Sequence, residues 1–101
     1  MAQQSTNAGI KNSQRVSEPR MYVVYLHNDD FTPMDFVVDI LVNIFGKPFA
    51  EAVTIMMDVH TGGRGVAGTY TYDIAHSKAH KAMRLARSEG YPLRLSCEPA
   101  Q

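Results

Sequence analysis

The sequence predicts an α+β sandwich in which three helices pack on a three-stranded antiparallel sheet, in the order βααβαβ. Short runs rich in β-branched and aromatic residues, which are typical of strands, alternate with longer segments whose apolar residues recur at helical spacing. A chain of 101 residues can build one hydrophobic core but not two. We therefore expect one core domain over residues 21–101, preceded by an N-terminal extension.

The extension, residues 1–20, is rich in Gln, Asn, Ser and basic residues, and Ile10 and Val16 are its only β-branched aliphatic residues. Because so few apolar side chains cannot offset the entropy of ordering, we expect this segment to be disordered. The first strand is expected over residues 21–26 and stops at a polar cluster typical of turns and helix starts.

The first helix is expected over residues 33–45. Thr32 has the chemistry of a helix cap, Pro33 suits the first helical position, and Asp35 completes a capping box three residues after the cap. Apolar residues then recur at helical spacing until Gly46, which is a natural C-terminal stop.

Four further elements complete the expected order. A second amphipathic helix opens near residue 48 and ends at a pair of glycines. Residues 65–71 predict a strand that its glycines weaken and could bend. Residues 73–89 predict a third helix, with alanines on one side and lysines and arginines on the other. Residues 91–97 alternate apolar and polar side chains and predict the last strand.

The composition excludes several classes of partner. Ten basic and ten acidic residues give a formal net charge of +0, so there is no electrostatic argument for nucleic acid or an anionic membrane. Acidic residues dominate 21–60 and basic residues dominate 61–101, which fits either ordinary solvated charge or two surfaces for different partners.

The chain has no long apolar run and no signal-peptide core, so we expect a cytoplasmic protein. Cys97, the single cysteine, excludes an intramolecular disulfide and a cysteine-based zinc cage.

Three acceptor side chains, Asn28, Asp29 and Asp30, come after the first expected strand. Such residues often only bind the free backbone N–H groups at a helix start. Alternatively, they could hold a donor-rich cation, and a primary ammonium with three N–H donors suits them.

The histidines also allow more than one interpretation. His60 lies at the end of the second expected helix, where its cation would be favoured by the helix dipole, so it could be only a C-terminal cap. His76 and His80 share one helix face and could begin a weak zinc site, but no third ligand is evident at local spacing. We therefore expect no metal and no cofactor.

Catalysis is difficult to build from these residues. Asn28, Asp29, Asp30 and His60 could mimic an acid–base set. The sequence nevertheless lacks a nucleophile elbow, a glycine-rich phosphate loop after a strand and a metal cage. We therefore expect that the protein is not an enzyme.

Three motifs together are more specific than any of them alone: Asn-Asp-Asp-Phe-Thr-Pro-Met over residues 28–34, Met-Met-Asp-Val-His over residues 56–60, and Pro92-Leu93 with Glu98. With them the chain resembles ClpS, the adaptor family of the bacterial Clp protease, over about residues 21–98. The resemblance implies the fold predicted above. It also implies recognition of N-degron substrates, whose first residue is Leu, Phe, Tyr or Trp, and their delivery to the AAA+ unfoldase ClpA for degradation by ClpP.

The resemblance also implies roles for individual residues. Asn28, Asp30 and His60 would hold the free α-amino group of the substrate, and Asp29 would reinforce the acidic entrance. Met34 would act as a gate that excludes a β-branched first residue. The residues implied to line the pocket for the first side chain are Thr32, Met34, Val37, Met56, Val59 and Leu93.

A second surface is implied around the start of the third helix, where Asp73 and Lys78 would dock the N-terminal domain of the unfoldase. The extension would engage the unfoldase during delivery. Two other functions stay open: a small metal-dependent or acid–base hydrolase that uses Asp29, Asp30 and His60, and a structural α+β interaction domain whose acceptor cluster is only a helix cap.

Overall fold

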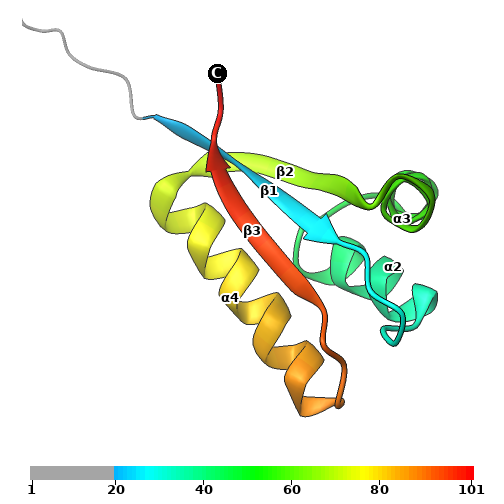
Figure 1. Ribbon diagram of the computed structural model, residues 1–101. Helices are drawn as coiled ribbons and strands as arrows, with labels where there is room; N and C mark the ends of the chain where they lie inside the picture. Colours follow the sequence, from blue (N-terminus) through cyan, green and yellow to red (C-terminus); the bar gives the residue numbers. More distant parts are fainter. Residues whose placement is uncertain (1–19) are drawn as a thin grey trace, which may run out of the picture.

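The structure is a computed structural model that describes residues 20–101, so the prediction of a disordered extension concerns residues that lie almost entirely outside it. The elements appear in the predicted order βααβαβ (Figure 1). They are β1 (Met21–His27), α2 (Met34–Asn43), α3 (Phe49–Gly62), β2 (Arg64–Thr71), α4 (Tyr72–Ser88) and β3 (Arg94–Pro99). The predicted α+β class and antiparallel sheet are confirmed.

The sheet has the order β2-β1-β3, so β1 is central and pairs antiparallel with both neighbours. The register of β1 with β2 shifts between Val24 and Tyr25: Val24 lies opposite Gly68, whereas Tyr25 lies opposite Val66. Ala67 is therefore an extra residue in β2, which is the geometry of a bulge and increases the local twist. Gly68, where the sequence predicts a possible bend, lies next to this bulge.

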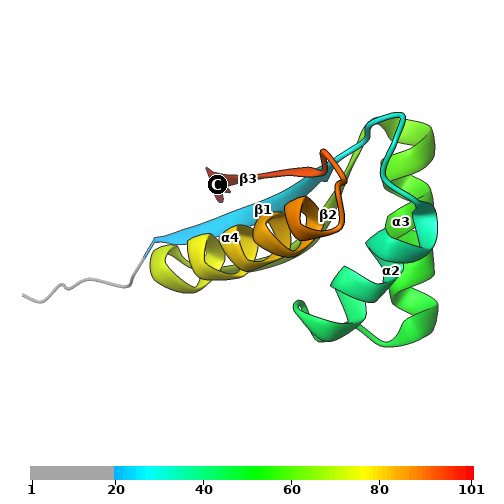
Figure 2. The same cartoon turned by 90° about the horizontal axis from the view of Figure 1, so that it is seen from below.

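The helices form two groups around the sheet. α4 runs along one face of it, while α2 and α3 pack against each other beside one end (Figures 1 and 2). Because alternate residues of a strand point to opposite faces, Val24, Leu26 and Leu95 enter the core from the sheet. The side of α4 that faces them is made of buried alanines, whose small side chains let the helix lie close to the strands: Ala75, Ala79, Ala82 and Ala86.

α3 and β2 approach each other closely at Gly65. A Cβ atom at this position would lie 2.8 Å from Cγ2 of Val59 and 3.0 Å from the carbonyl oxygen of Ile55. Only glycine fits without moving the helix away from the strand. No helix within residues 20–101 is long and apolar enough to cross a membrane.

The capping box predicted for the first helix is wrong. α2 begins at Met34, Pro33 occupies the N-cap position, and no side chain caps the helix. The hydroxyl of Thr32 instead donates a 2.8 Å hydrogen bond to Oδ2 of Asp29, in the loop before the helix. The acceptor that organises this turn is thus Asp29 and not Thr32.

The bounds predicted for the last strand are also wrong. Arg87, in the last turn of α4, donates hydrogen bonds to the carbonyl oxygens of Tyr91 and Leu93, at 2.9 and 2.8 Å. The backbone N–H of Tyr91 donates to Ala86 at 2.8 Å. Residues 91–93 are therefore bound to the end of α4, and pairing with β1 begins only at Arg94.

Candidate functional site

The end of β1 meets the end of α3 because β1 pairs with the strand that directly follows α3. His27 lies opposite Arg64 in the sheet. The next residue, Asn28, donates its backbone N–H to the carbonyl oxygen of Gly63 at 2.9 Å. Gly63 ends α3 in the left-handed conformation, with φ 93°. Strand pairing and this hydrogen bond therefore bring Asn28 close to His60, in the last turn of α3.

A hollow of about 380 Å³ lies between the β1–α2 loop, the start of α2 and the C-terminal half of α3. The sequence motifs at 28–34 and 56–60, which are far apart in the chain, thus form one site. The lining residues are Asn28, Asp29, Asp30, Phe31, Thr32, Pro33, Met34, Val37, Met56, Val59 and His60.

The apolar part of the hollow combines fixed and adaptable side chains. Val37 on α2 and Val59 on α3 are buried core residues, whose positions are fixed by packing. Met56 is half-buried beside them, and Met34 at the start of α2 is 42% exposed. Because methionine is unbranched and flexible, these two side chains can adapt to a guest that occupies the space.

The polar part of the hollow carries acceptors that face solvent. Asn28, Asp30 and His60 are all exposed. Within residues 20–101 the side chains of these three residues form no hydrogen bond with another protein group. They are therefore available to a ligand that brings hydrogen-bond donors.

Asp29 has a different environment from its neighbours. Its Oδ1 accepts hydrogen bonds from the backbone N–H groups of Phe31 and Thr32, each at 2.8 Å, and its Oδ2 accepts from the Thr32 hydroxyl. Burial acts to raise the pKa of Asp29, but these three bonds and the positive charge of Arg87 outweigh it and lower the pKa. The carboxylate thus fixes the loop that carries Asn28 and Asp30.

Two predicted groups lie outside the hollow. Leu93 is 1% exposed and belongs to the core, and it is not among the residues that line the hollow. Asp73 is exposed in the first turn of α4. Lys78 donates from Nζ to the carbonyl oxygen of Ile44 at 2.9 Å, which ties α4 to the end of α2. The start of α4 lies at the opposite end of the sheet from α2 and α3 (Figures 1 and 2).

Two lining residues were not assigned a role in the site from the sequence. Phe31, at the tip of the loop, is 79% exposed, and Pro33 precedes the first turn of α2. Both stand inside the motif over residues 28–34, which was the available signal. Among the described residues 20–101, no group of three or more His, Cys, Asp or Glu side chains could hold a metal ion.

Residues 17–96 match the family model described as ATP-dependent Clp protease adaptor protein ClpS. The chain belongs to the ClpS family. It is 49% identical to the ATP-dependent Clp protease adapter protein ClpS of Clostridium acetobutylicum over 92 residues, which are 91% of each chain. It is 55% identical to that of Syntrophus aciditrophicus over 89 residues, which are 88% of this chain and 83% of the relative.

A solved structure agrees with this assignment. Agrobacterium tumefaciens ClpS2 bound to L-phenylalaninamide superposes with a TM-score of 0.79 at 36% identity, and the match covers 82% of this chain and 100% of that one. The resemblance to ClpS noted in the sequence, and the fold that it implies, are confirmed.

Proposed function

We propose that this ClpS-family chain is a non-catalytic adaptor that binds N-degron substrates in the hollow between α2 and α3. It then delivers them to a ClpA-type unfoldase for degradation by ClpP. The observation that carries the proposal is the composition of one hollow. Three acceptors whose side chains form no hydrogen bond within residues 20–101 stand beside four apolar side chains: Asn28, Asp30 and His60 beside Met34, Val37, Met56 and Val59.

The acceptors match a free α-amino group. An ammonium that leaves bulk water needs hydrogen-bond partners for its three N–H donors, because burial without them is costly. Asp30 supplies the opposite charge, and Asn28 and His60 supply further polar atoms. Acetylation removes the charge and two donors, so an acetylated N-terminus does not fit.

The apolar part matches a large first side chain. Burying Leu or Phe is worth roughly 1.5 to 3 kcal/mol, and each charge-assisted hydrogen bond about the same before ordering costs. Together they support affinity in the micromolar to sub-micromolar range. The related ClpS2 binds L-phenylalaninamide, which combines a free α-amino group with a benzyl side chain.

The unfoldase would use a different surface. Asp73 lies in the first turn of α4, whose start is at the other end of the sheet from the hollow. Lys78 lies further along α4 and contacts Ile44 at the C-terminal end of α2, whereas the hollow lies at the start of α2. A substrate and the N-terminal domain of the unfoldase can therefore be bound at the same time. The extension, residues 1–20, would contact the unfoldase during delivery.

The test is fluorescence anisotropy with three labelled peptides: one that begins with Leu, its N-acetylated twin, and a control that begins with Ile. We expect tight binding of the first peptide only, because the resemblance to ClpS implies that Met34, which lines the hollow, is a gate that excludes a β-branched first residue. Equal binding of all three, or binding of none, would refute the proposal in favour of an interaction domain without degron recognition. Turnover of a peptide would favour a hydrolase.

Two variants assign the site. Asp30→Ala and His60→Ala should each weaken binding of the Leu peptide at least about tenfold, because each removes a hydrogen-bond partner of the amine. Neither side chain has a structural hydrogen bond within residues 20–101, so the unfolding midpoint should stay at the wild-type value. Wild-type affinity in both variants would remove the amine site from these residues.

A further inference from the structure

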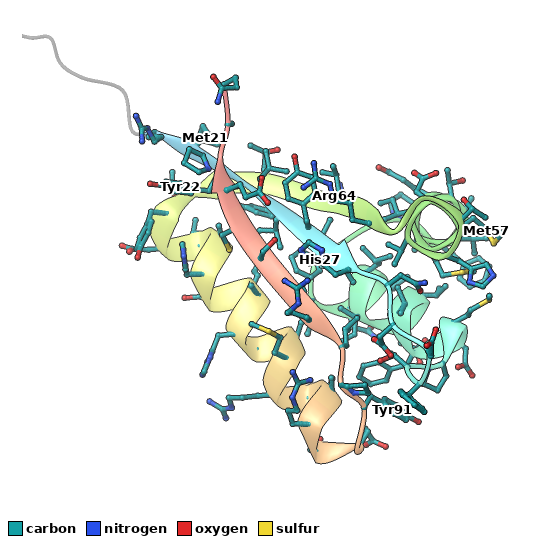
Figure 3. The ribbon with its side chains drawn as sticks, in the orientation of Figure 1. Met21, Tyr22, His27, Met57, Arg64 and Tyr91 are labelled. Atoms are coloured by element: carbon teal, nitrogen blue, oxygen red, sulfur yellow. The ribbon has the colours of Figure 1, made fainter. Side chains whose placement is uncertain are left out.

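The face of the sheet opposite α4 carries a row of cationic and titratable side chains at the end that leads into the hollow. Val24 and Leu26 point into the core, so the alternation of β1 places His27 on the opposite, open face. His27 lies opposite Arg64 of β2 on one side and Arg94 of β3 on the other. One row across the three strands thus reads Arg64, His27, Arg94, and Figure 3 shows His27 and Arg64 on the same side of the sheet.

Contacts within the face hold two of these side chains in place. The Arg64 guanidinium lies 4.0 Å from the centroid of the Tyr25 ring and 3.4 Å from Oε2 of Glu98. His27 Nε2 lies 2.6 Å from the hydroxyl oxygen of Ser96. Arg94 is exposed and forms no ion pair with an acidic side chain of residues 20–101.

The two arginines of the row act electrostatically on His27 between them. The pKa of His27 is lowered first by partial burial and then by the charges of Arg94 and Arg64, against a smaller opposing effect of Glu98. Both arginines are therefore close enough to act on the ring, and each affects its pKa more than Glu98 does, although Glu98 is paired with Arg64. A second carboxylate beside the row would be attracted by the same charges.

The row continues directly from the rim of the hollow. Asn28 comes after His27 in the chain, Gly63 precedes Arg64, and a hydrogen bond joins Asn28 to Gly63. An extended peptide advances about 3.3 Å per residue, so its third to sixth residues lie roughly 7 to 17 Å from its amino end. Neighbouring strands are about 4.8 Å apart, so the row spans a similar length.

We propose that Arg64, His27 and Arg94 form a second subsite, which binds acidic side chains in the third to sixth residues of an N-degron held by the hollow. This inference rests on the proposed function, because the row is reached by a chain whose first residue is already bound. An acidic segment is the occupant that the charges favour: the hollow itself presents Asp30 to the amine, and the row next to it presents cations. Among substrates that share a first residue, the adaptor would then bind those with more acidic third to sixth residues more tightly.

The test compares three Leu-first peptides of one length, with Glu, Ser or Lys at positions three to five, by fluorescence anisotropy at low and high salt. Two exposed charge pairs favour the Glu peptide over the Ser peptide by roughly three- to tenfold. The preference should shrink in high salt, where exposed charges are screened. In Arg94→Glu the order should reverse, so that the Lys peptide binds best, an outcome that a merely structural arginine would not produce.

Arg84→Ala is the matched control, because Arg84 is an exposed arginine on α4 and should leave the ranking unchanged. Equal affinities of the three Leu peptides would overturn the subsite while leaving the proposed function intact. Failure of all three to bind would instead refute the proposed function. Binding of an N-acetylated Glu peptide as tightly as the free one would also overturn the subsite, since the row would then act as an independent surface for acidic proteins.

Discussion

Replacing Asp29 with alanine should lower the free energy of unfolding. Its neighbours Asn28 and Asp30 are instead proposed to bind the ligand. The substitution removes three hydrogen bonds to one carboxylate, two from part-buried donors of Thr32 and one from the exposed N–H of Phe31. Water can replace the exposed hydrogen bond, so only the two part-buried hydrogen bonds contribute to the expected loss of stability. At about 0.5 to 1.5 kcal/mol for each, the free energy of unfolding should fall by about 1 to 3 kcal/mol.

The effect should depend on pH in a defined direction. Because the folded protein lowers the pKa of Asp29 below its ordinary value of 3.8, the stabilisation is complete above that value and is lost as the pH falls through the lowered folded pKa. The assay is urea unfolding monitored by far-UV circular dichroism at pH 7 and at about pH 3. The difference in the free energy of unfolding between wild type and Asp29→Ala should be smaller at the lower pH.

Two further variants separate structure from ligand binding. Asp29→Asn keeps an acceptor oxygen for the backbone donors and should lose less stability than Asp29→Ala. Asp30→Ala should unfold like the wild type. If Asp29→Ala has the same urea unfolding midpoint as the wild type at pH 7, this carboxylate does not organise the loop. The same conclusion follows if the difference in stability between the two proteins does not change with pH.

Three other predictions concern packing and reactivity. Gly65→Ala places a methyl group against α3 and should lower the free energy of unfolding by about 1 to 3 kcal/mol. Gly62→Ala, at the end of α3, should be neutral or slightly stabilising, because its Cβ would meet nothing within 4 Å and alanine favours the helix; equal melting temperatures of the two variants would refute the close approach. Lys78→Met removes the hydrogen bond to the end of α2 and should cost about 1 kcal/mol, with exposed Lys81→Met as a control that should not change the melting temperature. Burial raises the pKa of the Cys97 thiol, so its reaction with a disulfide reagent at pH 8 should be slower than that of free cysteine and should accelerate in urea; an equal rate in the folded protein would contradict the burial.

Much of the fold was predictable because hydrophobic periodicity reports directly which residues are buried. The apolar faces of the helices, the alanine side of α4 and the alternation in β1 all depend on nearby residues in the sequence. The order of elements and the antiparallel sheet agree with these patterns. Gly63 and Gly90, both at positive φ, mark the ends of α3 and α4 as the sequence indicated.

The errors arose where a distant or competing partner decides the geometry. Thr32 had the chemistry of a cap, but Asp29 offers its hydroxyl a stronger, charged acceptor. Residues 91–93 alternate like a strand, yet Arg87 binds the carbonyl oxygens of Tyr91 and Leu93 and holds them to α4. Hydrogen bonds of this kind depend on the folded arrangement of side chains, which periodicity does not encode.

The site shows the same division. The motifs themselves indicated acceptors and apolar residues, but their meeting in one hollow depends on the pairing of β1 with β2 and on the hydrogen bond from Asn28 to Gly63. The pocket role implied for Leu93 was based on its motif. In the structure Leu93 is buried in the core and is not among the residues that line the hollow, and its pocket role stays a prediction.

The central place of β1 has a consequence for synthesis. Its two neighbours come late in the chain: His27 pairs with Arg64 and also with Arg94. The sheet therefore closes long loops and should form more slowly than the local helices. While the chain is being translated, β1 lacks one partner until Arg94–Pro99 has emerged from the ribosome, so the first strand to be made is among the last to be fully paired.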